Sequence, residues 1–257
     1  MVVEIEGVNS DIKGDAKLWR YMDFTKLVSM LSTQSIYFCR SDEFKDVFEG
    51  VIFGYEVETA REDLENVLSE FGFSEQFKAN ALRNPEKYKE SVLKRSEVDR
   101  KNVFINCWHL NDYESAAMWD LYLKSNEGIA IQTTFDRVKQ SLNVYKEDIY
   151  IGKVKYIDHT KQKNLNKSFL EPFFTKRISF KHEQEVRLVY ALTPFHEEYD
   201  ENPDEKGKNV QVDLTNLIEC VYVSPDAAPW FVEVVKVILE KFNIDTKVIH
   251  SDLYKVK

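Results

Sequence analysis

Three ionisable side chains alternate along one short segment, H-E-Q-E-V-R-L-V-Y-A-L at residues 182–192. Successive side chains of a β-strand point to opposite faces, so Glu183, Glu185 and Arg187 would share one face, with about 7 Å between next-but-one neighbours. Because an unpaired buried carboxylate is costly, such a row either faces water or lines a polar cleft. The first alternative is a surface strand on which Arg187 pairs with the glutamates. The second is a site with two carboxylates.

A close pair of carboxylates has a definite chemistry. The pKa of one rises unless a cation lies nearby, and Lys176, Arg177 or Arg187 could be that cation. A carboxylate in this setting can hold a sugar hydroxyl and stabilise positive charge on a sugar carbon, as glycosyl transfer requires. We therefore take Glu183 and Glu185 as the candidate catalytic residues.

A cation and several aromatic residues could complete such a site. Arg20 lies on a predicted strand whose inward face also carries Leu18 and Met22, and its fork of donors suits a phosphate. The alternative for Arg20 is a structural ion pair with Glu49 or a later carboxylate. The aromatic residues Trp108, Trp119 and Tyr122 could stack on a base or a nicotinamide ring, or could simply belong to the core. The candidate ligand-binding residues are Arg20, Tyr21, Glu49, Trp108, Ser115, Trp119, Tyr122, Lys176 and Arg187.

Several other chemistries lack their motifs. The five histidines and three cysteines show no metal-ligand spacing, and the eight glycines form neither a Rossmann fingerprint nor a P-loop. No G-x-S-x-G nucleophile elbow is present. Cys107 lies two residues from His109, which could indicate thiol catalysis, but a core role for Cys107 is favoured. We expect no metal.

Composition indicates a folded protein with a hydrophobic core. Of the 257 residues 43% are hydrophobic, 13% aromatic and 31% charged, and the net charge is -9. The negative charge does not indicate nucleic-acid binding, which rests on clustered Lys and Arg. Unpaired, scattered cysteines fit a reducing compartment. With no signal peptide and no apolar run of about 18 residues, a cytoplasmic protein without a membrane partner is expected.

The hydrophobic patterns predict an α+β fold, a mixed and mostly antiparallel sheet with short helices, in a single domain over 1–257. Strands are predicted at 17–22, 35–39, 103–110, 128–135, 150–157, 180–192, 210–214, 219–223 and 247–250. Helices are predicted at 24–31, 137–142 and 229–242, and a further helix is predicted after a capping box formed by Asn111 and Glu114. Residues 55–100 are predicted to form a helical insertion that could contact a protein partner, and 194–209 a mobile hairpin loop.

Four blocks of sequence carry a resemblance to a known family. They are L-W-R-Y-M-D-F at 18–24, S-I-Y-F-C-R-S-D-E-F-K-D-V-F-E-G at 35–50, C-W-H with E-S-A-A-M-W-D-L-Y within 107–122, and K-R-I-S-F-K-H-E-Q-E-V-R at 176–187. With these four blocks in this order, the chain resembles a family of uncharacterised bacterial proteins, the domain of unknown function numbered 2971. That family usually has Asn and Pro where this chain has Lys45 and Val47, so the geometry of this turn can differ.

The order of an early strand with Arg, a middle strand flanked by aromatics and a late strand with Glu also looks like the plan of ADP-ribosyltransferases. That likeness implies NAD as substrate, held without a Gly-rich loop, and an ADP-ribosyltransferase or NAD glycohydrolase activity in bacterial conflict, as in phage defence or a toxin. Arg20 would hold the pyrophosphate or ribose, Trp119 or Tyr122 the nicotinamide, and Glu183 or Glu185 the ribose hydroxyl. The alternative is a non-catalytic module that binds a nucleotide or a peptide.

Overall fold

The computed structural model describes residues 2–4, 12–51, 76, 79, 82–123, 125–158 and 169–256. The predicted α+β class is confirmed. The strands are β1 (Val2–Glu4), β2 (Lys17–Asp23), β3 (Ser35–Arg40), β4 (Val103–Leu110), β5 (Gly128–Thr134), β6 (Ile149–Lys153), β7 (Lys155–Ile157), β8 (Thr175–Arg177), β9 (Glu185–Ala191), β10 (Gly207–Gln211), β11 (Cys220–Val223) and β12 (Lys247–His250).

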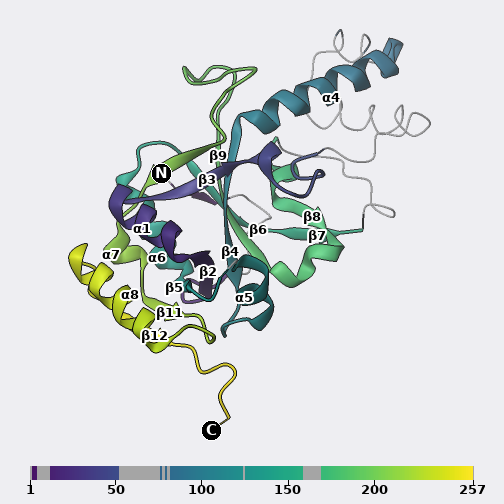
Figure 1. Cartoon of the computed structure of the whole chain (residues 1–257). Helices are drawn as coiled ribbons and strands as arrows, with labels where there is room; N and C mark the ends of the chain where they lie inside the picture. The colour runs from purple at the N-terminus through teal and green to yellow at the C-terminus, as the bar shows by residue number, and fades with distance from the viewer. Residues whose placement is uncertain are drawn as a thin grey trace.

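Helices connect these strands, and α4 (Pro85–Lys101) projects away from the sheet (Figure 1). The α-helices are α1 (Phe24–Thr33), α4 (Pro85–Lys101), α5 (Ala116–Tyr122), α6 (Phe135–Ser141), α7 (Leu214–Leu217) and α8 (Pro229–Lys241). The 3-10 helices are η1 (Ser41–Glu43), η2 (Leu142–Val144), η3 (Glu171–Phe174) and η4 (Ile178–Glu183). In the described part of the chain, no helix has the length and apolar character needed to cross a membrane.

The main sheet has the order β1-β6-β9-β4-β2-β5-β11-β12, and β3 pairs with both β4 and β10. Its pairings are antiparallel except those of β1 with β6 and of β11 with β12. The large core lies on one face, where side chains of α1, α6, α7 and α8 pack on the strands. Two smaller clusters lie on the other face, one with η3 and one with α5. Both faces of the central strands are therefore covered.

Strand β4 is the central element for the site, because two strands share one of its edges. β2 pairs with its end at His109 and Leu110, whereas β3 pairs with its beginning at Phe104 and Ile105. Between them, residues 106–108 have no strand partner on this edge among the described residues. Side chains fill the gap instead: Arg20 donates to the Cys107 carbonyl at 3.1 Å. The sheet therefore opens beside Cys107.

Three of the predicted segments need correction. The predicted strand 180–192 begins only at Glu185, because 178–183 form η4 and Gln184 takes the left-handed conformation with φ of 40°. The predicted strand 150–157 divides into β6 and β7, which belong to different sheets. The predicted strand 210–214 is shifted, since β10 ends at Gln211 and α7 begins at Leu214.

The expected capping box at Asn111 and Glu114 is also wrong. Ser115 is the N-cap residue of α5, and its hydroxyl accepts from the Met118 backbone N–H at 3.4 Å. Glu114 accepts instead from the indole of Trp119 at 3.0 Å. The helix thus begins after Glu114, whose carboxylate is engaged in tertiary contacts. Most of the predicted insertion, 55–100, lies outside the described residues, and α4 is its described end.

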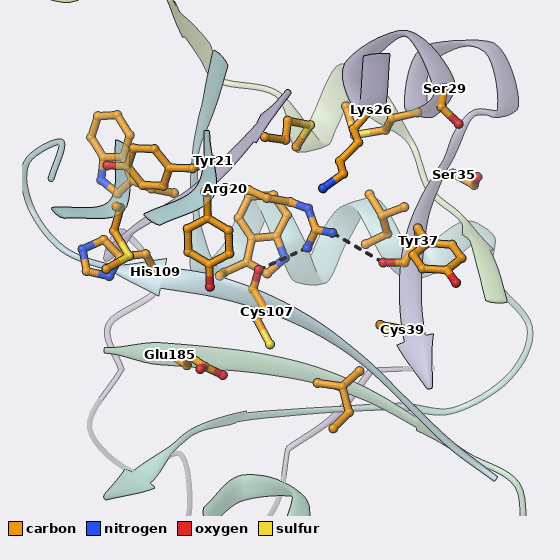
Figure 2. Close-up of a pocket in the computed structure, with 18 of the residues that line it drawn as sticks. Arg20, Tyr21, Lys26, Ser29, Ser35, Tyr37, Cys39, Cys107, His109 and Glu185 are labelled. Atoms are coloured by element: carbon orange, nitrogen blue, oxygen red, sulfur yellow. Dashed lines mark hydrogen bonds between the residues drawn. The ribbon is translucent and has the colours of Figure 1, made fainter. Parts of the chain in front are cut away.

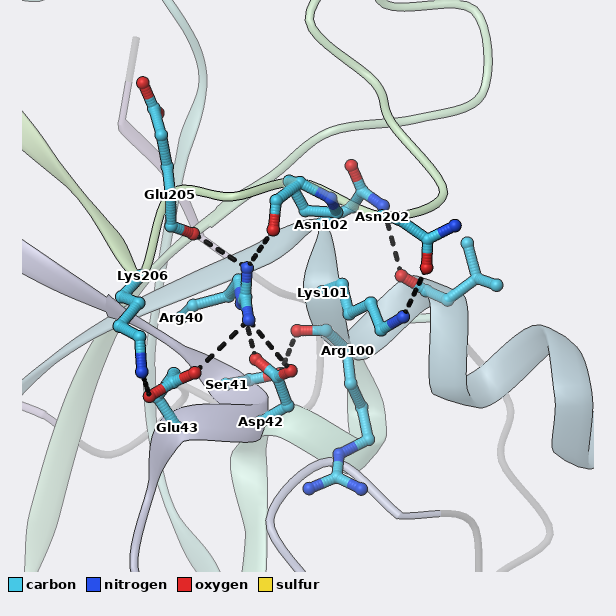
Figure 3. A network of polar contacts seen from close by, with 12 residues as sticks. Arg40, Ser41, Asp42, Glu43, Arg100, Lys101, Asn102, Asn202, Glu205 and Lys206 are labelled. Carbon is cyan, nitrogen blue, oxygen red and sulfur yellow. Dashed lines mark hydrogen bonds and ion pairs between the residues drawn. The ribbon is translucent and has the colours of Figure 1, made fainter.

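The predicted hairpin at 194–209 is not a hairpin, because β9 pairs with β4 and β6 whereas β10 pairs with β3. Arg40 at the end of β3 holds this connection in place (Figure 3). Its guanidinium donates to the carbonyls of Pro203 at 2.6 Å and Glu205 at 2.8 Å, and it pairs with Asp42 at 2.7 Å. Asn102 adds a bond to the Asp200 carbonyl at 2.7 Å.

Replacing Arg40 by methionine is expected to lower the free energy of unfolding by about 1–3 kcal/mol, since two carbonyls and Asp42 lose a largely buried donor. The segment 193–206 should also become more sensitive to proteolysis than in the unmodified protein. Lys206→Met is the control: this lysine is exposed and pairs with Glu43 at 3.0 Å, so its loss should cost less than about 1 kcal/mol. Equal effects of the two changes would contradict the assigned role of Arg40.

Candidate functional site

A pocket of about 510 Å³ lies where β2 and β3 diverge from β4. Its walls come from β2, α1, β3, β4, α5 and the start of β9 (Figure 2). The volume is within the range of small-molecule sites. Trp19, His109 and Glu185 are paired across three neighbouring strands, so two strand spacings, about 10 Å, separate the backbones of β2 and β9. Residues of β2 and β9, the two strands that flank β4, can therefore contact the same ligand.

Arg20 supplies a cation to one side of this pocket. Its guanidinium donates to the carbonyls of Cys107 and Tyr37, at 3.1 and 3.4 Å, and lies 5.8 Å from the centre of the Trp108 ring. Burial lowers its pKa, yet a guanidinium stays charged in proteins. Among the described residues, no carboxylate lies within ion-pair distance of it. The expected alternative, a pair with Glu49, is wrong, because Glu49 binds Arg187.

Lys26 lines the same pocket from α1 and is exposed. In Figure 2 its side chain extends from the helix toward Arg20. Two cations on one side of a pocket favour a ligand with a negative group there, such as a phosphate.

The other side of the pocket carries the two glutamates. Lys176 on β8 bridges them, with its ammonium 2.7 Å from Glu183 and 2.5 Å from Glu185. The second oxygen of Glu185 accepts from Arg187 at 2.6 Å. Because η4 folds the chain back just before β9, Glu183 approaches Lys176 from outside the strand. The pair thus exists, although Glu183 is not a strand residue.

Arg187 anchors the network below the pocket. Its side chain has no exposed surface, and it forms a two-point ion pair with Glu49, one contact of which is 3.0 Å. It also donates to the Phe173 carbonyl at 2.6 Å. Burial lowers the pKa of Arg187, but Glu185 and Glu49 outweigh burial, so the net shift is well upward. The network is therefore a buried, compensated set of charges.

The two glutamates titrate differently. Burial raises the pKa of Glu183 to about 7, and the negative charge of Glu185 acts in the same direction. Burial also raises the pKa of Glu185, but Arg187 and Lys176 outweigh it and hold the pKa well below its usual range. Glu185 is thus a permanent anion at neutral pH, whereas Glu183 can take up or release a proton.

The raised pKa of Glu183 predicts a dependence of stability on pH. Between about pH 4.5 and 7 the folded protein keeps a proton that the unfolded chain releases, so the free energy of unfolding falls as pH rises, by up to about 1.4 kcal/mol per pH unit. Glu183→Gln should remove this contribution. Urea unfolding of both proteins at a series of pH values measures it, and parallel curves would contradict the assigned titration.

Cys107 also lines the pocket, but as a thiol rather than a nucleophile. Burial raises its pKa well above the usual value, and the charge of Glu185 adds to this effect. Because the thiolate is the reactive form, thiol catalysis is disfavoured.

The structure brings together only part of the predicted set. Those that line the pocket are Arg20, Tyr21, Trp108, Tyr122, Glu183 and Glu185. Lys176 contacts both glutamates and Arg187 contacts Glu185, whereas Glu49 contacts only Arg187 among these residues. Ser115 caps α5, and Trp119 is buried beside Tyr21 with ring centres 4.9 Å apart, so neither lines the pocket.

Among the lining residues outside the predicted set are Lys26 and His109. Lys26 gives no sequence signal beyond its place on an amphipathic helix. His109 was considered only as a partner of Cys107, yet its imidazole lines the pocket beside the glutamates. Its position opposite Glu185 depends on the register of β4 against β9, for which the sequence gives no signal.

The sequence matches no family model, no curated protein and no solved structure with significant similarity. The resemblance to the domain of unknown function numbered 2971 and the likeness to ADP-ribosyltransferases therefore stay predictions.

Proposed function

We propose that this chain binds NAD, or a closely related nucleotide, in the pocket and releases or transfers its ADP-ribose. The observation that carries the proposal is that Arg20 and the pair Glu183 and Glu185 line one pocket although Arg20 lies on β2, Glu183 on η4 and Glu185 on β9. A cation that has no carboxylate partner among the described residues on one side, and a fixed carboxylate on the other, suit a molecule that has a pyrophosphate and a reacting ribose.

Each group has a role in this reaction. Arg20 holds the pyrophosphate, and Tyr122 and Trp108 offer aromatic surface to the nicotinamide. When the bond between the ribose and the nicotinamide breaks, the electron pair leaves with the nicotinamide and positive charge develops on the sugar carbon. The anion of Glu185 stabilises that charge. An acceptor oxygen, from water or a substrate hydroxyl, then bonds to the carbon and gives its proton to Glu183 in its carboxylate form.

One observation favours a non-catalytic module as the second candidate. Both oxygens of Glu185 already accept from cations, one from Lys176 and one from Arg187. A carboxylate held in this way can be purely structural, with the pocket binding a nucleotide or peptide through Arg20 without chemistry. This candidate predicts thermal stabilisation by the ligand with no product.

Incubation of the purified protein with NAD separates the two. The enzyme proposal predicts release of nicotinamide, and loss of this release in Glu183→Gln with little change in NAD binding. Glu198→Gln, which removes an exposed carboxylate outside the pocket, should behave as the unmodified protein. Stabilisation by NAD without nicotinamide release supports the binding module. Neither release nor binding at millimolar NAD would overturn the enzyme proposal and would leave only a module that binds another nucleotide or a peptide.

A further inference from the structure

Tyr122 is the last residue of α5, and it lines the pocket with 40% of its surface exposed. Its neighbours along the chain fix its place. Trp119, one turn earlier, is buried against Tyr21, and the Trp119 carbonyl accepts from the Leu123 backbone N–H at 3.1 Å. Leu123 packs on the same small hydrophobic cluster. Tyr122 therefore reaches the pocket from a helix end that is held on both sides.

The charges that act on the phenol indicate where its hydroxyl lies. Burial raises the pKa of Tyr122, and Cys107 acts in the same direction. The carboxylates of Glu183 and Glu185 raise this pKa further, whereas the guanidinium of Arg20 lowers it. All of these groups line the pocket. Because the effect of a charge falls with distance, the hydroxyl lies among them, and the exposed surface of Tyr122 belongs to the pocket wall.

The hydroxyl of Tyr122 has no hydrogen-bond partner among the residues that the structure describes. The nearby guanidinium of Arg20 donates instead to two backbone carbonyls, at 3.1 and 3.4 Å. The raised pKa keeps the phenol protonated at neutral pH, so its hydrogen is available to an acceptor. A neutral donor therefore stands in the pocket between a cation and two carboxylates.

We propose that Tyr122 is a substrate-binding residue whose hydroxyl donates a hydrogen bond to an oxygen of the reacting ribose. The inference rests on the proposed function, which places the pyrophosphate at Arg20 and the sugar carbon beside Glu185. The ribose then spans the interval in which the Tyr122 hydroxyl lies. A carboxylate can only accept the hydrogen of a sugar hydroxyl, whereas the phenol can donate to the oxygen. The two kinds of group together recognise a sugar.

Tyr122→Phe tests this contact, because it removes the hydroxyl and keeps the ring that the proposed function places against the nicotinamide. Calorimetry measures the binding of NAD, ADP-ribose and ADP to the variant and to the unmodified protein, and the Tm of each protein is recorded. We expect the variant to bind NAD and ADP-ribose roughly 5- to 10-fold more weakly at nearly unchanged Tm. ADP keeps the pyrophosphate but lacks the second ribose, so its affinity should stay within about twofold.

Tyr113→Phe is the matched control, since Tyr113 is 77% exposed and does not line the pocket. It should bind all three nucleotides as the unmodified protein does. Unchanged affinity of Tyr122→Phe for NAD and ADP-ribose would overturn the inference alone. An equal loss for ADP, or a loss that only follows a fall in Tm, would also overturn it, because either result shows a general change of the pocket. If the unmodified protein binds neither NAD nor ADP-ribose, the proposed function fails and the inference fails with it.

Discussion

Replacing Arg187 by methionine is expected to lower the free energy of unfolding by about 3–5 kcal/mol, because the change leaves buried carboxylates without their cation. Arg187 has no exposed surface, and its guanidinium contacts Glu49, Glu185 and the Phe173 carbonyl. Methionine fills part of the volume but donates no hydrogen bond. For a chain of this size each kcal/mol corresponds to about 2–4 °C in Tm, so thermal unfolding should show a large decrease.

Arg95→Met is the matched control for this change. Arg95 is half exposed on α4 and pairs with Asp99 one turn away at 2.8 Å. Exposed pairs of this kind contribute less than about 1 kcal/mol. Similar decreases in Tm for the two variants would show that Arg187 does not anchor a buried network.

A double substitution tests the pairing of Arg187 with Glu49 directly. When Arg187→Met is combined with Glu49→Gln, the loss should be smaller than the sum of the two single losses, because each single change already breaks the same contact. Additive losses would contradict the two-point ion pair.

Glu185→Gln is expected to reduce nicotinamide release from NAD by about 10²–10³-fold, the cost of losing one electrostatic contact to the transition state. The substitution keeps the size of the side chain and removes its charge. The ion pairs of Lys176 with Glu183 and of Arg187 with Glu49 remain, so the variant should still fold. NAD affinity should change little, because Glu185 is proposed to act on charge that develops only during bond cleavage.

The measurement is single-turnover nicotinamide release together with NAD calorimetry on the same preparation. A fall in turnover with unchanged affinity supports the assigned role of Glu185. Turnover equal to that of the unmodified protein would show that Glu185 has only a structural role, and it would contradict the proposed mechanism.

The strand and helix pattern was largely predictable because it depends on local periodicity. Val103–Leu110 and Lys247–His250 occur at their predicted bounds, and α8 differs by one residue at its end. The alternation along 185–191 also predicted the two faces correctly, since Val186 and Leu188 lie in the large core whereas Val189 lies in a smaller cluster on the other face.

The partners of the charges were not predictable in the same way. Glu49 and Arg187 are 138 residues apart, and nothing in their local sequence distinguishes this pair from the expected pair of Glu49 with Arg20. The turn at Gln184 has a left-handed backbone at a residue other than glycine, which sequence patterns do not indicate. Because of this turn, Glu183 belongs to η4 rather than to β9, and its side chain reaches Lys176 from there.

The pocket itself depends on sheet topology. It exists because β2 and β3 pair with opposite ends of β4, and strand order is not contained in hydrophobic periodicity. The prediction that Arg20 points inward was correct, and the divergence of these two strands explains what it contacts.

The most direct test of the central claim is a crystal structure of the Glu185→Gln variant with NAD. The claim is that Arg20 and residue 185 contact one bound nucleotide from opposite sides of β4. We expect the pyrophosphate within hydrogen-bond distance of the Arg20 guanidinium and the nicotinamide ribose beside position 185. An empty pocket at saturating NAD, or NAD bound elsewhere on the protein, would contradict it.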